Sequence, residues 1–458
     1  MPQHETNRAA VILAAGIGRR FRSAVPKVIH DILGRPLLAW VVDACRQAGI
    51  DDIVVVVSPA IREQVTAVLP DVRIAVQDEP RGTADAVSVA LPFLPETGLV
   101  IVASGDTPCL RSETIATVLE AAASTPLALL TCRVPDPQGY GRIVRADDGS
   151  VERIVEHADA NDAERAIDEI NAGLYAFDLT ALRNWLPRIG SDNAQGEHYL
   201  VDTVSMCREG DAPPRAVLLE NPDEIQGIND RVQLASAEEI LRRRIVDHWR
   251  RQGVTVHGDD VMIGPDVTLE SDVDIASGVE LHGCTHVATG TTIGRGCVLT
   301  NARIGADVRL KPYVVAEDAE IGSGAQIGPF AHLRPGTRLG RDVRIGNFVE
   351  TKNIEMGEGS KANHLSYLGD AEIGSGVNIG AGTITCNYDG ANKHRTVIED
   401  DVFVGSDTQF VAPVRIGRGA TIGAGTTVTR DVSPGALAVR RAPQKEYPDY
   451  PRKRKSSS

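Results

Sequence analysis

Residues 315–345 read VAEDAEIGSGAQIGPFAHLRPGTRLGRDVRI, with an aliphatic side chain at every sixth position. This period fits neither an α-helix, which repeats every 3.6 residues, nor a half-exposed strand, which repeats every two. It is the hexapeptide pattern of a parallel β-helix, in which three hexads form a coil and coils stack about 4.8 Å apart. The rhythm runs from about 255 to 433. Its anchors are Val261, Val267, Val273, Val279, Val315, Ile321, Ile327, Leu333, Leu339, Ile345, Ile398, Val404, Phe410, Ile416, Ile422 and Val428.

The whole chain has 458 residues and a formal net charge of −14. The length predicts two or three domains, and the charge argues against nucleic-acid or membrane-surface partners. We expect no membrane span and no secretory signal, because no apolar run is long enough and the first residues lack a basic region before an apolar one. The 7 cysteines contain no Cys-x-x-Cys pair, which predicts reduced thiols and a cytoplasmic protein.

Residues 8–228 alternate apolar runs with helical patterns, which predicts an α/β domain with a mostly parallel, Rossmann-like sheet covered on both faces. The expected strands are 10–14, 53–57, 74–76, 99–103 and 127–132, and the expected helices are 37–48, 61–69, 83–91 and 113–122. Residues 229–252 contain neither Gly nor Pro and predict a linker helix. The predicted domains are therefore 1–228, the linker 229–252, and 253–458, ending in a flexible basic tail at about 446–458.

A glycine-rich loop follows the first strand, in VILAAGIGRRFRSAVPK at residues 11–27. The free N–H groups around Gly16 and Gly18 can hold phosphate oxygens. Phe21 stands where a dinucleotide fingerprint needs its third glycine, and the Gly-Lys-Ser/Thr of a Walker loop is missing. Arg20 and Lys27 add two cations beside this loop, as a triphosphate requires.

Two stretches of the β-helix lose the rhythm, at about 350–367 and 385–397. We interpret both as polar insertions, and loops on a rigid scaffold often carry function. The first contains His364, whose side chain can take a proton near neutral pH. On its own a loop histidine is more often structural, so the assignment depends on its sequence context.

The sequence context comes from motifs that resemble those of a known enzyme family. Leu-Ala-Ala-Gly-x-Gly-x-Arg followed by Pro-Lys resembles the sugar-1-phosphate nucleotidyltransferases. The later motifs follow in order: Gln77, Gly82-Thr83, Gly105-Asp106, Gly139-Tyr140-Gly141-Arg142, Glu156, Asn171, Gly227-Ile228-Asn229, HLSYLGD at 364–370 and NIGAGTITCNYDG at 378–390. Over about 8–445 the chain resembles the bacterial enzymes that combine N-acetylglucosamine-1-phosphate uridylyltransferase with glucosamine-1-phosphate N-acetyltransferase. The resemblance implies a left-handed β-helix and synthesis of UDP-N-acetylglucosamine, a precursor of peptidoglycan and lipopolysaccharide-type polymers.

For uridylyl transfer, the resemblance implies UTP as co-substrate and Mg²⁺ held by Asp106 and Asn229. Asp106 also follows a buried strand, at the edge where ligands enter an open α/β sheet. This family commonly has Tyr before Gly-Asp, where this chain has Ser104. The implied nucleotide and sugar contacts are Leu13, Ala14, Gly16, Arg20, Lys27, Gln77, Gly82, Thr83, Gly141, Glu156, Asn171 and Asn229.

For acetyl transfer from acetyl-CoA, the resemblance makes His364 the general base, and Glu350 is expected to orient His364 or the amine. The implied sugar-phosphate contacts are Arg334, Lys352, Tyr367, Asn378 and Lys393. The implied acetyl-CoA contacts are Asn387, Tyr388, Ser406, Ala424 and Arg441. The family forms homotrimers through the β-helix. The alternative is a sugar-nucleotide transferase with one activity, whose β-helix only oligomerises or regulates.

Overall fold

The computed structural model describes residues 7–16, 18–210, 213–440 and 443–450. It divides into two compact units, Met1–Arg243 and Arg244–Ser458. The boundary falls inside helix α8 (Arg231–Arg251), which occupies the stretch expected to be helical. The limits 1–228, 229–252 and 253–458 remain a prediction, and residues 451–458 of the expected basic tail lie outside the described residues.

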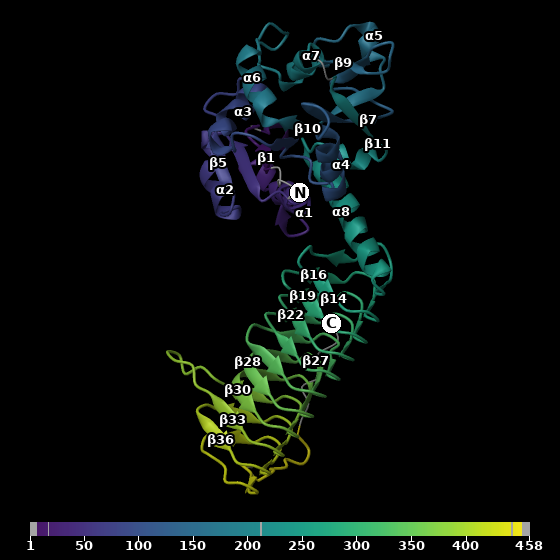
Figure 1. The fold of residues 1–458 in the computed structure, drawn as a ribbon. Helices are drawn as coiled ribbons and strands as arrows, with labels where there is room; N and C mark the ends of the chain where they lie inside the picture. Colours follow the sequence, from purple (N-terminus) through teal and green to yellow (C-terminus); the bar gives the residue numbers. More distant parts are fainter. Residues whose placement is uncertain (1–6, 17, 211–212, 441–442, 451–458) are drawn as a thin grey trace, which may run out of the picture. The chain divides into compact units, whose positions relative to one another are not determined.

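The first unit is built on a twisted, mostly parallel sheet with the strand order β11-β7-β10-β6-β1-β4-β5 (Figure 1). β1 pairs in parallel with β4 and β6, and β10 runs antiparallel between β6 and β7. The strands are β1 (Arg8–Leu13), β2 (Asp31–Ile32), β3 (Arg35–Pro36), β4 (Asp52–Val57), β5 (Arg73–Val76), β6 (Leu99–Ser104), β7 (Leu127–Arg133), β8 (Arg142–Arg145), β9 (Val151–Val155), β10 (Glu169–Asp178) and β11 (Arg215–Leu219). The predicted α/β sheet is confirmed.

Helices cover both faces of this sheet because successive strand residues point to opposite sides. Ala10 and Ile12 of β1 belong to one buried cluster, and Ala9 and Val11 belong to the other. The first cluster includes residues of α1, α2 and α4, and the second includes residues of α3, α6 and α7. The helices are α1 (Leu37–Gln47), α2 (Arg62–Val68), α3 (Thr83–Ala90), α4 (Ser112–Ala122), α5 (Asp162–Arg165), α6 (Leu179–Trp185) and α7 (Thr203–Arg208).

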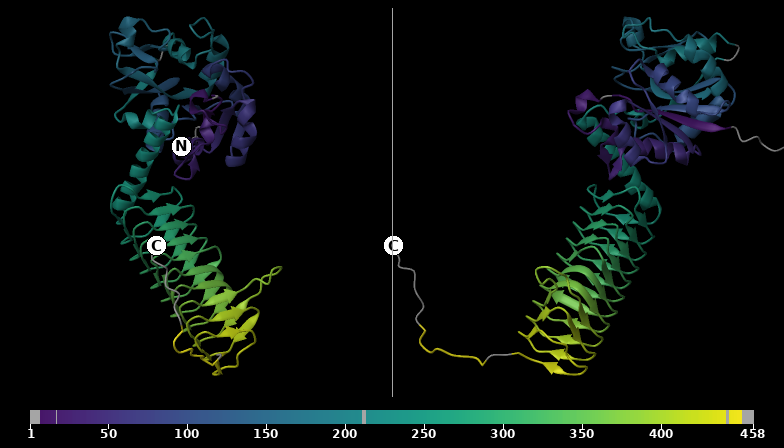
Figure 2. Two further views of the ribbon diagram at one scale, coloured as in Figure 1. Left: turned by 180° about the vertical axis from the view of Figure 1, so that it is seen from behind. Right: turned by 90° about the vertical axis from the view of Figure 1, so that its left-hand side faces the viewer.

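The second unit is a parallel β-helix whose described strands form three ladders along the faces of a prism (Figures 1 and 2). Its hexapeptide repeats are those of the left-handed form, as expected. The first ladder runs through β12 (Thr255–Val256), β15 (Asp274–Ile275), β18 (Thr292–Ile293), β21 (Arg309–Leu310), β24 (Gln326–Ile327), β27 (Arg344–Asn347), β29 (Lys361–His364), β31 (Asn378–Ile379), β34 (Phe403–Val404), β37 (Thr421–Ile422) and β39 (Leu437–Ala438).

The other two ladders share the long strands β28 (Glu350–Met356) and β30 (Tyr367–Ile373), which turn a corner of the prism. One contains β13 (Met262–Ile263), β16 (Glu280–His282), β19 (Val298–Thr300), β22 (Val315–Glu317), β25 (His332–Leu333), β32 (Ile384–Cys386), β35 (Gln409–Val411) and β38 (Thr427–Val428). The other contains β14 (Thr268–Leu269), β17 (His286–Val287), β20 (Arg303–Ile304), β23 (Glu320–Ile321), β26 (Thr337–Leu339), β33 (Thr396–Ile398) and β36 (Val414–Ile416).

The hexad anchors form the core of the β-helix, with one exception. Ile321, Ile327 and Leu333 are almost completely buried, and a second buried position lies two residues before each, as at Ala331 before Leu333. Val315 is only half-buried, because the coil at this point is one residue shorter and Ala316 takes the inward position. The prediction of Val315 as an anchor was therefore wrong by one residue.

The two interruptions of the rhythm differ in kind. Residues 350–367 are no insertion: β28, β29 and β30 continue the coil, with pairs such as Asn347 and His364 that lie 17 residues apart. The aliphatic pattern is lost there because Thr351 and Ala362 occupy inward positions. Residues 385–397 do contain an insertion, since the neighbouring coils pair residues 25 apart, as Ser375 and Asp400 do. This loop projects from the stack in Figure 1.

A column of exposed apolar side chains marks one edge of the β-helix. Tyr313, Phe330 and Phe348 stack face to face, with ring centroids 5.1 and 5.6 Å apart. Leu365 continues this edge column beside His364. All 7 cysteines lie within the described residues, and none of them forms a disulfide. Over the described residues, none of the helices has the length and apolarity that crossing a membrane demands.

Candidate active sites

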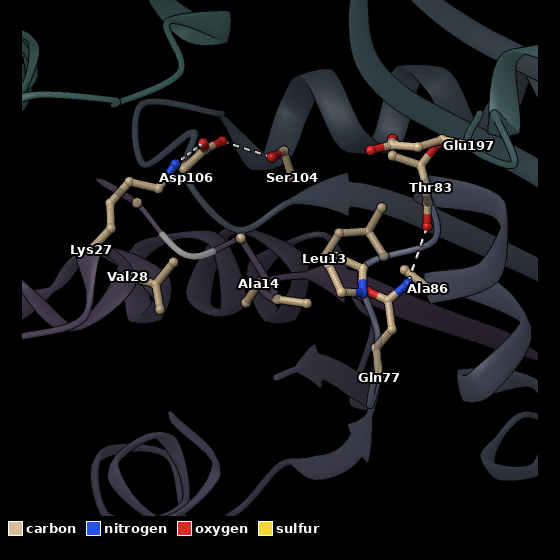
Figure 3. A pocket seen from close by; sticks show the side chains of 15 residues that line it. Leu13, Ala14, Lys27, Val28, Gln77, Thr83, Ala86, Ser104, Asp106 and Glu197 are labelled. Carbon is tan, nitrogen blue, oxygen red and sulfur yellow. Dashed lines mark hydrogen bonds and ion pairs between the residues drawn. The ribbon is translucent and has the colours of Figure 1, made fainter. Parts of the chain in front are cut away.

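The ends of β1, β5 and β6 surround a cavity of about 460 Å³ in the first unit (Figure 3). It lies at the carboxyl edge of the parallel strands, where ligands enter open α/β sheets. Eight residues predicted from the sequence line it together: Leu13, Ala14, Gly16, Lys27, Gln77, Gly82, Thr83 and Asp106. The lining also includes Gly18 of the predicted phosphate loop, and six residues that sequence reasoning gave no contact role: Ala15, Val28, Pro80, Ala86, Ser104 and Glu197.

Backbone geometry forces glycine at two points of this lining. Gly82 has φ +112°, and a side-chain carbon there would lie 2.4 Å from the carbonyl oxygen of His198. Gly18 has φ +63°, and such a carbon would lie 2.8 Å from Cβ of Lys27. Both positions therefore need glycine to let neighbouring chain segments approach.

Asp106 lies between a cation and a hydroxyl group. Lys27 Nζ is 2.5 Å from one carboxylate oxygen of Asp106, and Ser104 Oγ donates a hydrogen bond of 2.6 Å to the other. The side chains of Lys27 and Asp106 are 10% and 20% exposed, so the ion pair is only partly screened by water. Ser104, the residue that departs from the family pattern, thus contacts the carboxylate directly (Figure 3).

The oxygen donors around Asp106 suit a hard divalent cation. The segment 227–229 packs against Asp106: the backbone N–H of Ile228 donates to its carbonyl oxygen at 2.9 Å, and a side-chain carbon on Gly227 would lie 3.7 Å from Oδ1. This packing places the loop that carries Asn229, a second residue with an oxygen atom that can bind a metal, against the loop that carries Asp106. Carboxylate and amide oxygens fit Mg²⁺, which keeps several of its waters in such sites.

The three residues predicted to contact the sugar form a separate group outside the lining of the cavity. A side-chain carbon on Gly141 would lie 3.4 Å from Oε1 of Glu156 and 3.5 Å from Cβ of Asn171. The amide of Asn171 donates to the hydroxyl of Tyr175 at 2.6 Å. Burial raises the pKa of Glu156, and the charges of Asp159 and Asp202 raise it further. Arg20 is exposed and is likewise absent from the cavity lining.

In the second unit, three cations meet near the end of β28. The pKa of Lys352 is lowered, chiefly by contact with the Lys393 ammonium, with partial desolvation and the charge of Arg334 adding to the effect. Arg334 also bonds Glu350 at 2.8 Å. The carboxylates of Glu350 and Asp370 offset part of this positive charge, and the excess that remains is suited to bind an anion such as a phosphate.

His364 ends β29 at an exposed edge and contacts the coil before it. Its Nδ1 lies 3.1 Å from Oδ1 of Asn347. When Nδ1 donates this hydrogen bond, the lone pair of Nε2 is free to accept a proton. Glu350 bonds Arg334, and the described contact of the His364 ring is with Asn347, so the expectation that Glu350 orients His364 or the amine stays a prediction. Asn347 was missed because it belongs to a different coil.

A buried carboxylate organises the side chains beside Lys352. Asp370 is 8% exposed and accepts hydrogen bonds from the amides of Asn353 and Asn387, at 2.6 and 2.5 Å. A side-chain carbon on Gly369 would lie 2.5 Å from the Tyr367 hydroxyl and 2.9 Å from the Asn387 amide nitrogen. Tyr367 and Asn387 therefore both pack against Gly369, and Asp370 holds the amide of Asn387.

The inserted loop is held by its own hydrogen bonds. Tyr388 pairs with Lys393 as an isolated β-bridge, and its hydroxyl donates to the carbonyl of Gly390 at 2.6 Å. Asp389 accepts bonds from the backbone of Asn392 and from the ring of His394, which lower its pKa. This internal bracing presents Tyr388 and Lys393 at the surface.

Two of the predicted acetyl-CoA residues, Ser406 and Ala424, lie on the same edge of the prism as His364. Continuing the register of β29, β31, β34 and β37 places His364, Ser406 and Ala424 at equivalent positions of nearby coils. Asn378 lies on the same ladder, paired with Lys361 and Phe403. Arg441 lies outside the described residues. A larger hollow of about 660 Å³ follows β26, β28 and β30 and contains none of the predicted residues.

Comparison with known proteins agrees with this division of the chain. Residues 10–171 match the family described as the MobA-like NTP transferase domain. Residues 318–353 and 395–430 match the bacterial transferase hexapeptide repeat.

Similar proteins named "Bifunctional protein GlmU" align along nearly the whole chain. The protein of Trichlorobacter lovleyi is 47% identical over 95% of this chain and 96% of its own length. That of Burkholderia thailandensis is 46% identical over 98% and 99%, and that of Acinetobacter baylyi is 44% identical over 97% and 98%. At this identity and coverage, the chain belongs to the family of the bifunctional protein GlmU.

Proposed function

We propose that the chain is a bifunctional enzyme of UDP-N-acetylglucosamine synthesis. It acetylates glucosamine-1-phosphate with acetyl-CoA and then transfers the uridylyl group of UTP to the product, releasing pyrophosphate. The observation that carries the proposal is that two separate sets of polar residues, one around Asp106 and one around His364, lie on units matching a nucleotidyltransferase and a hexapeptide transferase. Identity along the whole chain to proteins named bifunctional favours this function over a nucleotidyltransferase with a merely structural β-helix.

In uridylyl transfer, a phosphate oxygen of the sugar phosphate attacks the α-phosphorus of UTP in line with the departing pyrophosphate. Such a transfer depends on positioning and charge neutralisation, so it requires no protein nucleophile. Lys27 neutralises phosphate charge, Gln77 and Gly82 hold the base, and Gly141, Glu156 and Asn171 hold the sugar. Mg²⁺ held by Asp106 and Asn229 would supply further charge neutralisation on the phosphates.

In acetyl transfer, Nε2 of His364 removes a proton from the substrate amine, which attacks the thioester carbonyl and displaces the CoA thiolate. Arg334, Lys352 and Lys393 bind the sugar phosphate, and Tyr367 and Asn378 position the sugar. Asn387, Tyr388, Ser406, Ala424 and Arg441 bind acetyl-CoA. The Asn347 contact keeps the ring of His364 in one orientation.

The single-chain acetyl-transfer site is open: His364, Tyr388 and Lys393 are all exposed. We infer that the protein forms a homotrimer whose neighbouring subunits cover this edge, including the column Tyr313, Phe330, Phe348 and Leu365. We also place the enzyme in the cytoplasm, where it supplies precursor for peptidoglycan and related cell-envelope polymers. Light scattering measures the trimer directly, and Phe348→Asp should dissociate it.

Reconstitution tests the two-site proposal. Protein incubated with glucosamine-1-phosphate, acetyl-CoA, UTP and Mg²⁺ should form UDP-N-acetylglucosamine, and omission of acetyl-CoA should abolish that product. Asp106→Asn should stop uridylyl transfer and spare acetyl transfer, and His364→Ala should do the reverse. His257→Ala, an exposed histidine of another coil, serves as the control. If each of the two site variants loses both activities while folded, the assignment of two independent sites is wrong.

A further inference from the structure

The amide of Gln77 is held by two neighbours at the wall of the first-unit cavity. Gln77 is 5% exposed, and its backbone N–H is fixed by the carbonyl of Val57 at 2.9 Å. Its Nε2 lies 3.2 Å from the carbonyl oxygen of Gly82 and 2.8 Å from Oδ2 of Asp85. Figure 3 shows the side chain of Gln77 pointing toward the segment that carries Thr83, the first residue of α3.

The chemistry of these neighbours fixes which end of the amide faces them. A carbonyl oxygen and a carboxylate can only accept hydrogen bonds, so only the NH₂ group of Gln77 can face both. Both of its N–H groups are then used, and the remaining polar atom, Oε1, is the one left for a ligand. The Gly82 carbonyl cannot turn away, because it also accepts from the backbone N–H of Ala86 in helix α3.

Asp85 provides the stronger of the two restraints. The contact is the shorter one and is made to a charged acceptor, and charge-assisted hydrogen bonds are about twice as strong as neutral ones. Without Asp85, the amide could rotate by half a turn at the cost of the longer bond to Gly82 alone. The cavity would then offer N–H groups as readily as an oxygen.

We propose that Asp85 is a positioning residue for nucleotide choice: it holds the Gln77 amide so that Oε1 accepts from the nucleotide base. An acceptor at this point favours uracil, whose N3 carries a hydrogen, over cytosine, whose N3 carries only a lone pair. The inference rests on the proposed uridylyl transfer and adds to it a residue that does not itself touch the substrate.

A purely structural role for Asp85 makes a different prediction. Asp85 lies in the first turn of α3, where a carboxylate stabilises the helix N-terminus. In that role, its removal lowers stability without altering the preference between UTP and CTP. Nucleotide preference therefore separates the two roles.

The test compares Asp85→Leu, Asp85→Asn and the control Glu79→Gln in the full-length protein. Glu79 is an exposed carboxylate of the same loop that pairs with Arg81. For each variant, kcat and KM are measured with UTP and with CTP at saturating N-acetylglucosamine-1-phosphate and Mg²⁺. Urea unfolding reports the folded state.

Asp85→Leu should raise the KM for UTP and reduce the UTP-to-CTP preference in kcat/KM, each by about tenfold, with a smaller change in kcat. Asp85→Asn retains an oxygen that can accept from Nε2, so it should restore most of the preference. Glu79→Gln should match the unchanged protein. If Asp85→Leu fails to fold, Asp85→Ala gives the same comparison without added bulk.

An unchanged UTP-to-CTP preference in folded Asp85→Leu or Asp85→Ala would overturn the inference. So would an Asp85→Asn variant as impaired as Asp85→Leu, because charge rather than amide orientation would then be responsible. If the unchanged protein does not use UTP at all, the proposed function is contradicted. The experiment therefore distinguishes failure of the proposed function from failure of the inference about Asp85.

Discussion

Lys27 Nζ lies 2.5 Å from Oδ2 of Asp106, so the carboxylate proposed to bind Mg²⁺ already holds a cation in the protein alone. Because an ammonium and a metal ion compete for the same oxygen, we expect Lys27 to weaken metal binding until the phosphates of a nucleotide attract it. Lys27 is also the only lysine before residue 244. We therefore expect the pair to couple arrival of the nucleotide to binding of the metal.

Lys27→Met should bind Mg²⁺ more tightly in the absence of nucleotide, because the competing charge is gone. Its uridylyl transfer should fall by at least about tenfold, since one charged contact to the phosphates is lost. Calorimetric titration with Mg²⁺ and steady-state rates check the two effects. Lys361→Met, at an exposed lysine of the β-helix, is the control. Weaker Mg²⁺ binding by Lys27→Met would contradict the proposed competition.

Gly82→Ala should destabilise the first unit by about 1–3 kcal/mol, because alanine at φ +112° is strained and its methyl group would strike the backbone of His198. UTP binding should weaken in parallel. Gly190→Ala is the matched control, since an added carbon there meets nothing within 4 Å. If the two variants have equal urea midpoints, the backbone segments at residues 82 and 198 move apart to admit the methyl group without lowering the free energy of unfolding.

Glu156 links stability to pH. A carboxyl whose pKa is raised by folding holds its proton more tightly in the folded state than in the unfolded state. Its contribution to the free energy of unfolding is therefore fully present at acid pH, and it is lost as the pH rises through the raised pKa. Glu156→Gln should therefore be more stable than the unchanged protein at pH 7, and this advantage should vanish near pH 4, below the ordinary glutamate pKa of 4.5.

Urea unfolding at both pH values measures the effect. Glu96→Gln, at an exposed position, should show no such difference. The stabilised Glu156→Gln variant should still lose uridylyl transfer, because the proposed sugar contact needs the carboxylate. If Glu156→Gln differs from the unchanged protein by the same free energy of unfolding at both pH values, burial of the Glu156 charge imposes no penalty.

Asp370→Ala should impair acetyl transfer at least tenfold, chiefly through the KM for acetyl-CoA, because the buried amide of Asn387 and the exposed amide of Asn353 lose their acceptor and Asn387 is no longer held. Uridylyl transfer should be unchanged. Asp342→Ala is a close control: Asp342 also has a positive φ, +55° against +48° for Asp370, but is exposed. If both variants behave alike, backbone strain rather than the hydrogen bonds explains the loss.

Local patterns predicted the elements of the fold well. The apolar run of β6 and the hexads of the β-helix depend on neighbouring residues and a fixed period, which a sequence displays directly. The apparent gap at 350–367 was misinterpreted because Thr351 points inward. Its hydroxyl lies 3.0 Å from that of Thr337, so a polar residue of valine-like size fits the core once its hydrogen bond is made.

Contacts between coils were harder to predict. The pairing of His364 with Asn347 follows only if the coil between them has 17 residues, whereas Thr268 and His286 are 18 apart and Ser375 and Asp400 are 25 apart. The length of each coil depends on its corners and insertions, which the aliphatic period does not reveal. Asp85 was missed for a different reason: it acts on a ligand contact without being one.

Helix α8 has a consequence for anyone who wishes to separate the two activities. Its residue Ala237 is fully buried and accepts a contact from Cys109, whereas Val246 is part of the β-helix core. A cut before the helix takes Ala237 and its contact with Cys109 away from the first unit, and a cut after it strips the β-helix of the cover that Val246 provides. A split protein would keep both halves soluble only if each carried its own copy of residues 231–251.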